Sequence, residues 1–162
     1  VQELRERLRQ KSLNNQEITH CLLWLEKRGL LNDEEFAGAL VRDRIRFSPR
    51  SPFLLKRELQ EKGVARVLAE SVVDRVCHEE GFSTIELARI AAEGWVRKQG
   101  PALQERLIQD RFSEEREKAR GRLYGFLARR GFAGDAARCG MEAGEAKARS
   151  LAETREARDS GE

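Results

Sequence analysis

One short motif, which ends a helix, occurs three times along the sequence. The segments Leu25–Leu30, Leu59–Val64 and Leu127–Phe132 each place a leucine four positions before a glycine and another apolar residue directly after it. In a Schellman motif the glycine adopts a positive φ and the two flanking apolar side chains touch. The three segments therefore predict three helix ends, with the glycine of each in the left-handed conformation.

The helix ends at Gly63 and Gly131 are part of a longer repeat, which consists of two leucines, a small residue and three further apolar positions. Its copies begin at Leu4, Leu55 and Leu123, at intervals of 51 and 68 residues. The longer second interval indicates an insertion between the second and third copies. Apolar residues at helical spacing precede both of these copies, so each repeat is predicted to hold three helices.

These patterns predict an all-α protein in which three tandem three-helix repeats form an elongated, curved solenoid. Only three prolines interrupt the chain, and no apolar run approaches the length of a membrane span. Because the first helix of the first repeat would precede residue 1, we expect the chain to begin inside a longer native protein. The expected boundaries are 1–32 for repeat 1, 33–80 for repeat 2, 81–145 for repeat 3 and 146–162 for a charged, fraying C-terminal tail.

Helix starts are also predicted from local sequence. Asparagine and serine side chains accept hydrogen bonds from the free amides of a first helical turn, and proline suits its first position. The expected N-cap residues of the helices are Asn14 or Asn15, Asn32, Ser51 before Pro52, and Ser83 or Thr84.

Three stretches of the sequence resemble motifs of the RecX family of regulatory proteins. The segment Arg28–Ala37, followed by Val41–Arg44, resembles the most recognisable stretch of that family. Leu55–Val64 is similar to the family's second-repeat motif, and Phe126–Phe132 is similar to its third-repeat motif. The resemblance covers roughly residues 1–142, and the three motifs together are far more specific than any one of them alone.

This resemblance implies a modulator of the RecA recombinase. Proteins of the family lie in the groove of the RecA–DNA filament and usually inhibit strand exchange and ATP hydrolysis. The implied partners are the RecA filament and, with it, single-stranded or double-stranded DNA. We expect a monomer that acts without a cofactor and without a membrane.

The residues that carry enzyme or metal chemistry elsewhere do not form a recognisable site in this sequence. No glycine-rich phosphate loop is present. His20 adjoins Cys21 and Cys77 adjoins His78, but neighbours on a helix point about 100° apart and make poor chelating pairs. We therefore predict no catalytic residues and no bound metal. Three widely spaced cysteines do not suggest disulfides, which favours a reducing cytoplasm.

Two clusters of cations are the candidate binding residues. Asp43 is the single acid within the first cluster. Such clusters either form a solvated face or attract phosphates and the acidic surface of a partner, and the family resemblance favours a partner. The repeat spacing would align both clusters along one ridge. The predicted partner-binding residues are Arg42, Arg44, Arg46, Arg50, Lys56 and Arg57 in the first cluster, and Arg122, Arg129 and Arg130 in the second.

The alternative is a helical DNA-binding module of the helix-turn-helix type that acts without RecA. Direct readout of bases needs Asn, Gln or Arg side chains projecting from a recognition helix. The helix of the second motif instead mixes cations with acids, as at Arg57, Glu58 and Glu61. This mixture suits a protein partner better than a DNA groove.

Overall fold

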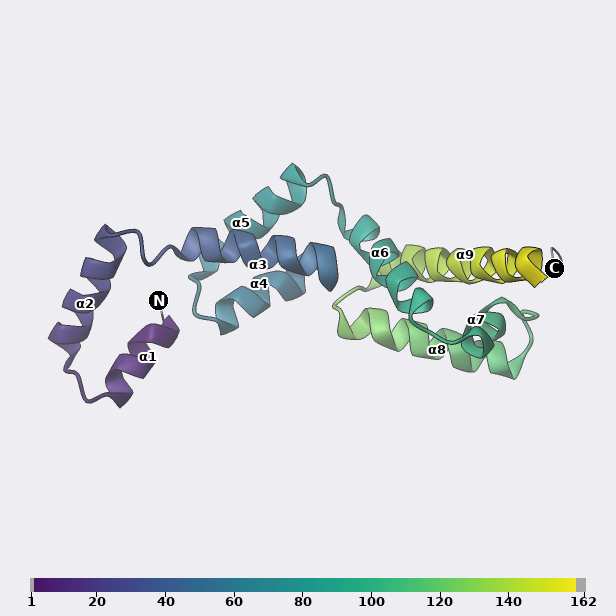
Figure 1. Cartoon of the computed structure of the whole chain (residues 1–162), viewed down its shortest axis with the longest axis horizontal. Helices are drawn as coiled ribbons and strands as arrows, with labels where there is room; N and C mark the ends of the chain where they lie inside the picture. The colour runs from purple at the N-terminus through teal and green to yellow at the C-terminus, as the bar shows by residue number, and fades with distance from the viewer. Residues whose placement is uncertain (1, 160–162) are drawn as a thin grey trace. The chain divides into compact units, whose positions relative to one another are not determined.

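The structure, a computed structural model, describes residues 2–159, and α-helices are the only regular elements over that range (Figure 1). The prediction of an all-α fold is confirmed. The described helices are α1 (Gln2–Gln10), α2 (Asn15–Lys27), α3 (Asp33–Phe47), α4 (Pro52–Glu61), α5 (Arg66–Glu79), α6 (Thr84–Arg97), α7 (Pro101–Ile108), α8 (Glu114–Arg129) and α9 (Gly134–Asp159).

The helices fall into two compact units. Unit 1 consists of the described residues up to Arg46 together with Pro52–Gly81, and it contains α1 to α5. Unit 2 consists of the segment Phe47–Ser51 and the described residues from Phe82 onward, and it contains α6 to α9.

The three glycine-ended helices have the predicted geometry. The φ angles are 68° at Gly29, 86° at Gly63 and 79° at Gly131. In each case the amide after the glycine donates to the carbonyl oxygen of the leucine five residues before it, over 3.0 to 3.1 Å. These hydrogen bonds satisfy carbonyl groups that a helix end leaves free, which is the purpose of a Schellman motif. All three predicted helix ends are confirmed.

A fourth helix end adopts the same geometry without a glycine. Ser12 has a φ of 62°, and it is the one non-glycine residue of the described range with a positive φ. Its amide donates to the carbonyl oxygen of Arg9 at 2.9 Å, and the amide of Leu13 donates to that of Leu8 at 3.4 Å. In the sequence repeat Ser12 occupies the place of Gly63. The first copy therefore ends its helix as the second does, but with a residue that is strained in this conformation.

The predicted helix starts are also observed. Asn14 and Ser83 each form a capping box, in which the side chain accepts from the third helical amide and a glutamate at that position accepts the cap's own amide. Asn32 accepts from the amide of Glu35 at 3.1 Å. Of each predicted pair, Asn14 and Ser83 are the residues that cap, rather than Asn15 and Thr84.

The core of unit 1 is formed by buried side chains of α3, α4 and α5. Ala37 and Val41 of α3 are fully buried, as are Leu55 and Leu59 of α4 and Val73 of α5. Their spacing of three or four residues places one apolar side of each helix toward the others. The opposite sides of these helices remain exposed and carry half of the first cation cluster.

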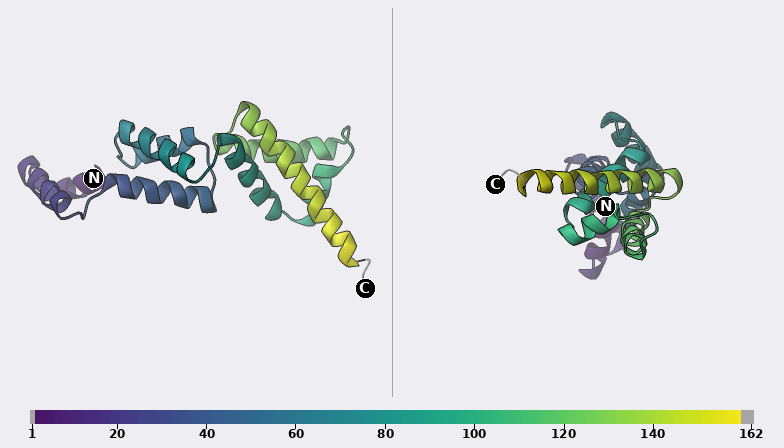
Figure 2. Two further views of the ribbon diagram at one scale, coloured as in Figure 1. Left: turned by 90° about the horizontal axis from the view of Figure 1, so that it is seen from above. Right: turned by 90° about the vertical axis from the view of Figure 1, so that its right-hand side faces the viewer.

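The core of unit 2 is built around α9, which packs against α6, α7 and α8 (Figure 2). Two glycines of α9 allow the close approach. A Cβ atom on Gly140 would lie 3.1 Å from the carbonyl oxygen of Ala88 in α6, and one on Gly144 would lie 2.7 Å from Cδ2 of Leu123 in α8. A side chain at either position would therefore force a neighbouring group to shift, and glycine avoids this.

The structure differs from the sequence expectation in residues 146–159. These residues were expected to fray into a solvated tail, but they continue α9 as far as Asp159. Ala148 is fully buried, and α9 packs against α7 as well as against α6 and α8. The helix α7 lies in the stretch that the repeat pattern marked as an insertion. Residues 160–162 lie outside the described residues, and the division into three repeats remains a prediction.

Candidate partner-binding surface

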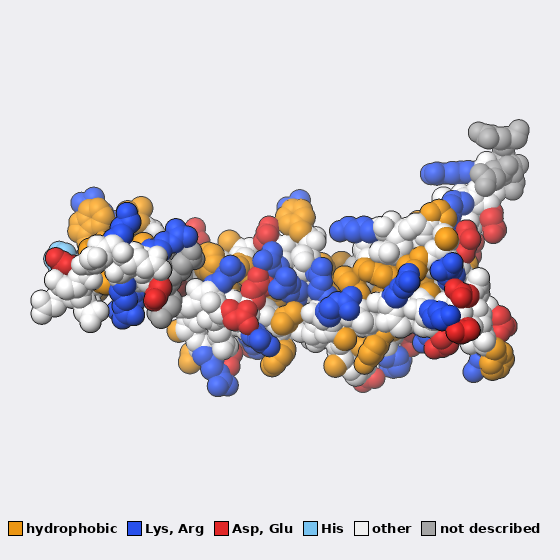
Figure 3. Space-filling model, turned by 90° about the horizontal axis from the view of Figure 1, so that it is seen from below, with side chains coloured by type: hydrophobic (Ala, Val, Ile, Leu, Met, Phe, Trp, Pro, Cys, Tyr) orange, Lys and Arg blue, Asp and Glu red, His pale blue; other side chains and the backbone are white. Residues whose placement is uncertain are grey.

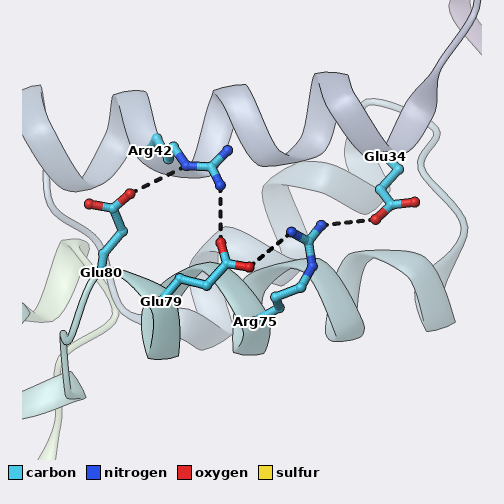
Figure 4. A network of polar contacts seen from close by, with 5 residues as sticks. All are labelled: Glu34, Arg42, Arg75, Glu79 and Glu80. Atoms are coloured by element: carbon cyan, nitrogen blue, oxygen red, sulfur yellow. Dashed lines mark hydrogen bonds and ion pairs between the residues drawn. The ribbon is translucent and has the colours of Figure 1, made fainter.

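Arg42 lies in an ion-pair network on unit 1, shown in Figure 4. Its Nη2 atom lies 3.1 Å from Oε2 of Glu79, and its Nε atom lies 3.3 Å from Oε1 of Glu80. Arg75 continues the network, with one nitrogen 3.3 Å from Glu79 and another 2.9 Å from Glu34. Glu79 of α5 and Glu80 directly after it therefore oppose the charge of Arg42.

Arg44 forms a second, less exposed ion pair. Its Nη2 and Nε atoms lie 2.7 and 3.0 Å from Oε1 of Glu58 in α4. The side chain of Arg44 is 28% exposed and that of Glu58 is 12% exposed. The hydrogen bond to Glu58 raises the pKa of Arg44 above its ordinary value. This pair ties α3 to α4 and leaves little of the guanidinium for a partner.

The cations of α4 are paired as well. Lys56 lies 2.7 Å from a carboxylate oxygen of Asp74, and Arg57 lies 2.8 Å from one of Glu61. The expectation that Asp43 is the only acid opposing the first cluster is therefore wrong. Its partners come from other helices or from the next turn, and on the face shown in Figure 3 cations lie interspersed with acids.

The remaining predicted residues of the turn region differ in exposure. Arg46 is exposed near the end of α3, and Arg50 is half-buried in the segment Phe47–Ser51. Arg130 is half-buried, and its Nη1 atom donates to Oγ of Ser48 at 2.7 Å and to the carbonyl oxygen of Pro49 at 3.2 Å. Arg130 thus holds the segment within unit 2.

Arg122 and Arg129 are the predicted residues best placed to bind an anion. Both are exposed on α8. A spacing of seven residues puts them on one side of the helix, two turns apart. Neither guanidinium has an ion-pair partner among the described residues. The neighbouring Lys118, by contrast, lies 2.8 Å from Glu114.

The structure also contains a buried charge cluster that sequence reasoning missed. Glu145 of α9 lies between Arg116 and Arg120 of α8, with Nη2 of Arg116 at 3.0 Å and Nη1 of Arg120 in direct contact. The side chain of Glu145 is 10% exposed. Glu145 follows Arg120 by 25 residues and Arg116 by 29, so no local sequence pattern signals this cluster. These two arginines therefore stabilise the fold.

The histidine and cysteine pairs do not come together. Cys77 is buried, and this burial raises the pKa of its thiol. His20 and His78 are exposed on separate helices. Among the described residues no group of three His, Cys, Asp or Glu side chains is arranged to hold a metal ion. None of the helices in the described range has the length and apolar character needed to cross a membrane.

Comparison with known proteins connects this fold to one family. A family model for the second three-helix domain of RecX matches residues 32–73. The chain is 33% identical over 130 residues to the regulatory protein RecX of Corynebacterium efficiens, covering 80% of this chain and 57% of that protein. It is 31% identical over 134 residues to the regulatory protein RecX of Amycolatopsis mediterranei, covering 81% of this chain and 66% of that protein.

A third relative, the regulatory protein RecX of Halalkalibacterium halodurans, is 30% identical over 99 residues. That match covers 61% of this chain and 35% of the relative, so the chain spans between about a third and two thirds of the curated relatives it matches. The crystal structure of RecX from Lactobacillus salivarius has the same fold, with a TM-score of 0.65 and 20% sequence identity, over 89% of this chain and 84% of that one. By its sequence and its fold, the chain belongs to the RecX family of regulatory proteins.

Proposed function

We propose that this protein binds the RecA–DNA filament and inhibits the recombinase and ATPase activities of RecA. Membership of a family of regulatory proteins supports the proposal. In this view the protein is not an enzyme. It acts as a monomer in the cytoplasm, and its three free cysteines suit a reducing compartment.

The observation that carries the proposal is the pair of unpartnered arginines on α8. Arg122 and Arg129 lie about 10 Å apart along one side of the helix. A guanidinium presents several donors in a fixed plane and binds phosphate or carboxylate oxygens in pairs. A filament offers both groups, from its DNA and from acidic side chains of its subunits.

Two mechanisms of inhibition fit such a surface. In the first, the bound protein occupies the groove through which a second DNA must enter. In the second, it bridges neighbouring RecA subunits and disturbs their ATPase cycle. The first predicts that strand exchange falls more strongly than ATP hydrolysis on single-stranded DNA. The second predicts that both activities fall together.

The test is charge reversal of both arginines, Arg122→Glu with Arg129→Glu. We expect the concentration needed to inhibit RecA strand exchange to rise at least about tenfold, because two charge-assisted contacts become repulsive. The matched control reverses Arg97 and Arg138, two exposed arginines of the same unit that are paired within their own helices.

The double variants carry the same net charge, so a general electrostatic effect would weaken both equally. Inhibition by the α8 variant at the parent's concentration, with an unchanged melting curve, would refute a binding role for these arginines. The helix-turn-helix alternative would be favoured by a different result. In that result the α8 variant loses affinity for naked DNA, and RecA does not change the affinity of the parent protein for DNA.

A further inference from the structure

Unit 2 contains a small apolar cleft. It is lined by residues 47–49, by α6 and by the C-terminal end of α8. Its volume is about 160 Å³, and Phe47, Ile90, Trp95 and Phe126 contribute its apolar surface. The side chain of Phe47 is 67% exposed and that of Ile90 is 39% exposed, so the apolar surface continues to the rim. Isolated exposed apolar residues are ordinary, but several around one hollow mark a contact surface.

The walls of the cleft are held in place by contacts within unit 2. The amide of Ser51 donates to the carbonyl oxygen of Arg130 at 2.9 Å, and the guanidinium of Arg130 in turn holds Ser48. That guanidinium also lies 5.0 Å from the ring centre of Phe126, whose ring centre is 5.8 Å from that of Trp95. The cleft is therefore formed before anything enters it, which lowers the entropic cost of binding.

Gly94 contributes to the open space of this cleft. It lies inside α6, where glycine costs about 1 kcal/mol relative to alanine. A Cβ atom added to Gly94 would meet no described atom within 4 Å, unlike one added to Gly140 or Gly144. Packing within this chain thus gives no reason for a glycine at position 94. Its effect is to keep the cleft open, since Gly94 lines it.

The positive charge at the cleft favours an acidic ligand. The described residues that line it include Lys98 and Arg130 and no carboxylate. Lys98 is exposed at the end of α6 and has no ion-pair partner among the described residues. A carboxylate beside an apolar side chain would meet both parts of this surface.

We propose that this cleft binds a peptide segment of a protein partner, with an apolar side chain seated beside Gly94 and an adjacent carboxylate paired with Lys98. A protein segment fits better than a nucleic acid, because a stacked base needs an open aromatic face and Trp95 is half-buried against Phe126. The site does not depend on the arginines of α8 or on RecA being the partner.

The probe is a phage-displayed library of random peptides, panned on the full chain and counter-selected on its Gly94→Leu variant. We expect the enriched peptides to carry an aromatic or aliphatic residue beside Asp or Glu. Their binding is then followed by fluorescence of Trp95 in a Trp24→Phe protein, which leaves Trp95 as the single tryptophan. Peptide binding should change this fluorescence. The substitution Lys98→Glu should lower the affinity for the peptide about tenfold.

The matched control is Gly121→Leu, the same change at an exposed glycine of α8 whose added Cβ would also meet nothing within 4 Å. It should leave peptide binding unchanged, while Gly94→Leu abolishes it without lowering the melting temperature. Enrichment of basic peptides, or equal binding to the parent and Gly94→Leu proteins, would overturn the proposal. So would quenching of Trp95 by oligothymidylate that the selected peptide does not displace, since the cleft would then bind bases.

Discussion

Ser12 holds a backbone conformation that glycine adopts at lower cost. Side chains with a Cβ atom lose roughly 1 kcal/mol in the left-handed region. We therefore expect Ser12→Gly to raise the free energy of unfolding of unit 1 by up to about 1 kcal/mol. The measurement is urea denaturation followed by fluorescence of Trp24, in a Trp95→Phe background that leaves no tryptophan in unit 2.

The control for this prediction is Ser71→Gly, the same change at an exposed position within α5. There glycine should lower the stability of unit 1 by about 0.5 kcal/mol, because the helix gains backbone freedom on unfolding. Equal effects of the two substitutions, in sign and size, would show that Ser12 is not strained.

Glu145 of α9 forms the buried ion pairs that join α9 to α8. Glu145→Gln removes the charge that both Arg116 and Arg120 face, and leaves two guanidinium groups close together. Breaking a buried ion pair by removing one partner costs about 3 kcal/mol, so we expect a loss of that order in the stability of unit 2.

Denaturation followed by Trp95 fluorescence in the Trp24→Phe protein measures that loss. The matched substitution is Glu142→Gln, at an acid of the same helix whose pair with Arg138 is 61% exposed on both sides. It should cost at most about 0.5 kcal/mol, as exposed pairs do. A comparably small effect at Glu145 would mean that the buried cluster contributes only its packing.

The helices of unit 2 use glycine for two different purposes. In α9, Gly140 makes room for the backbone of α6, whereas in α6 Gly94 faces open space. Gly140→Val should therefore destabilise unit 2 by about 2 kcal/mol through overpacking. Gly94→Ala should stabilise it by up to about 1 kcal/mol through helix propensity. Thermal unfolding of both variants checks the pair, and a loss of stability in Gly94→Ala would contradict the open cleft.

Helix ends were predictable because their signals are local. Gly29 and Asn14 act through hydrogen bonds that span at most five residues, so the sequence around each is sufficient. The C-terminal half of α9 was not predictable in this way. Residues 146–159 have few large apolar groups, yet Ala148 is fully buried and α9 packs against α6, α7 and α8. Contacts with helices far away in the sequence are not signalled by the local pattern.

At the scale of the whole molecule, charge counted along the sequence misrepresents the surface. Arg42 and Arg44 look unopposed because their acidic partners follow them by 14 to 38 residues. Reversing Arg44 would leave Glu58 without its partner, so a loss of function in that variant would not identify a binding residue. Arg122 and Arg129 have no ion-pair partner among the described residues, so substituting them leaves no acid unpaired and tests partner binding directly.

The proposed function requires that the protein recognises the RecA–DNA filament rather than DNA alone. The most direct measurement is the affinity of the full chain for RecA filaments and for naked single-stranded DNA, each over a series of salt concentrations. We predict tighter binding to the filament than to naked DNA at every salt concentration. If Arg122 and Arg129 contact phosphates, a plot of the logarithm of the affinity against the logarithm of the salt concentration should fall with a slope of about two. Equal affinity for naked DNA and for filaments across the salt series would contradict the proposed recognition of the filament.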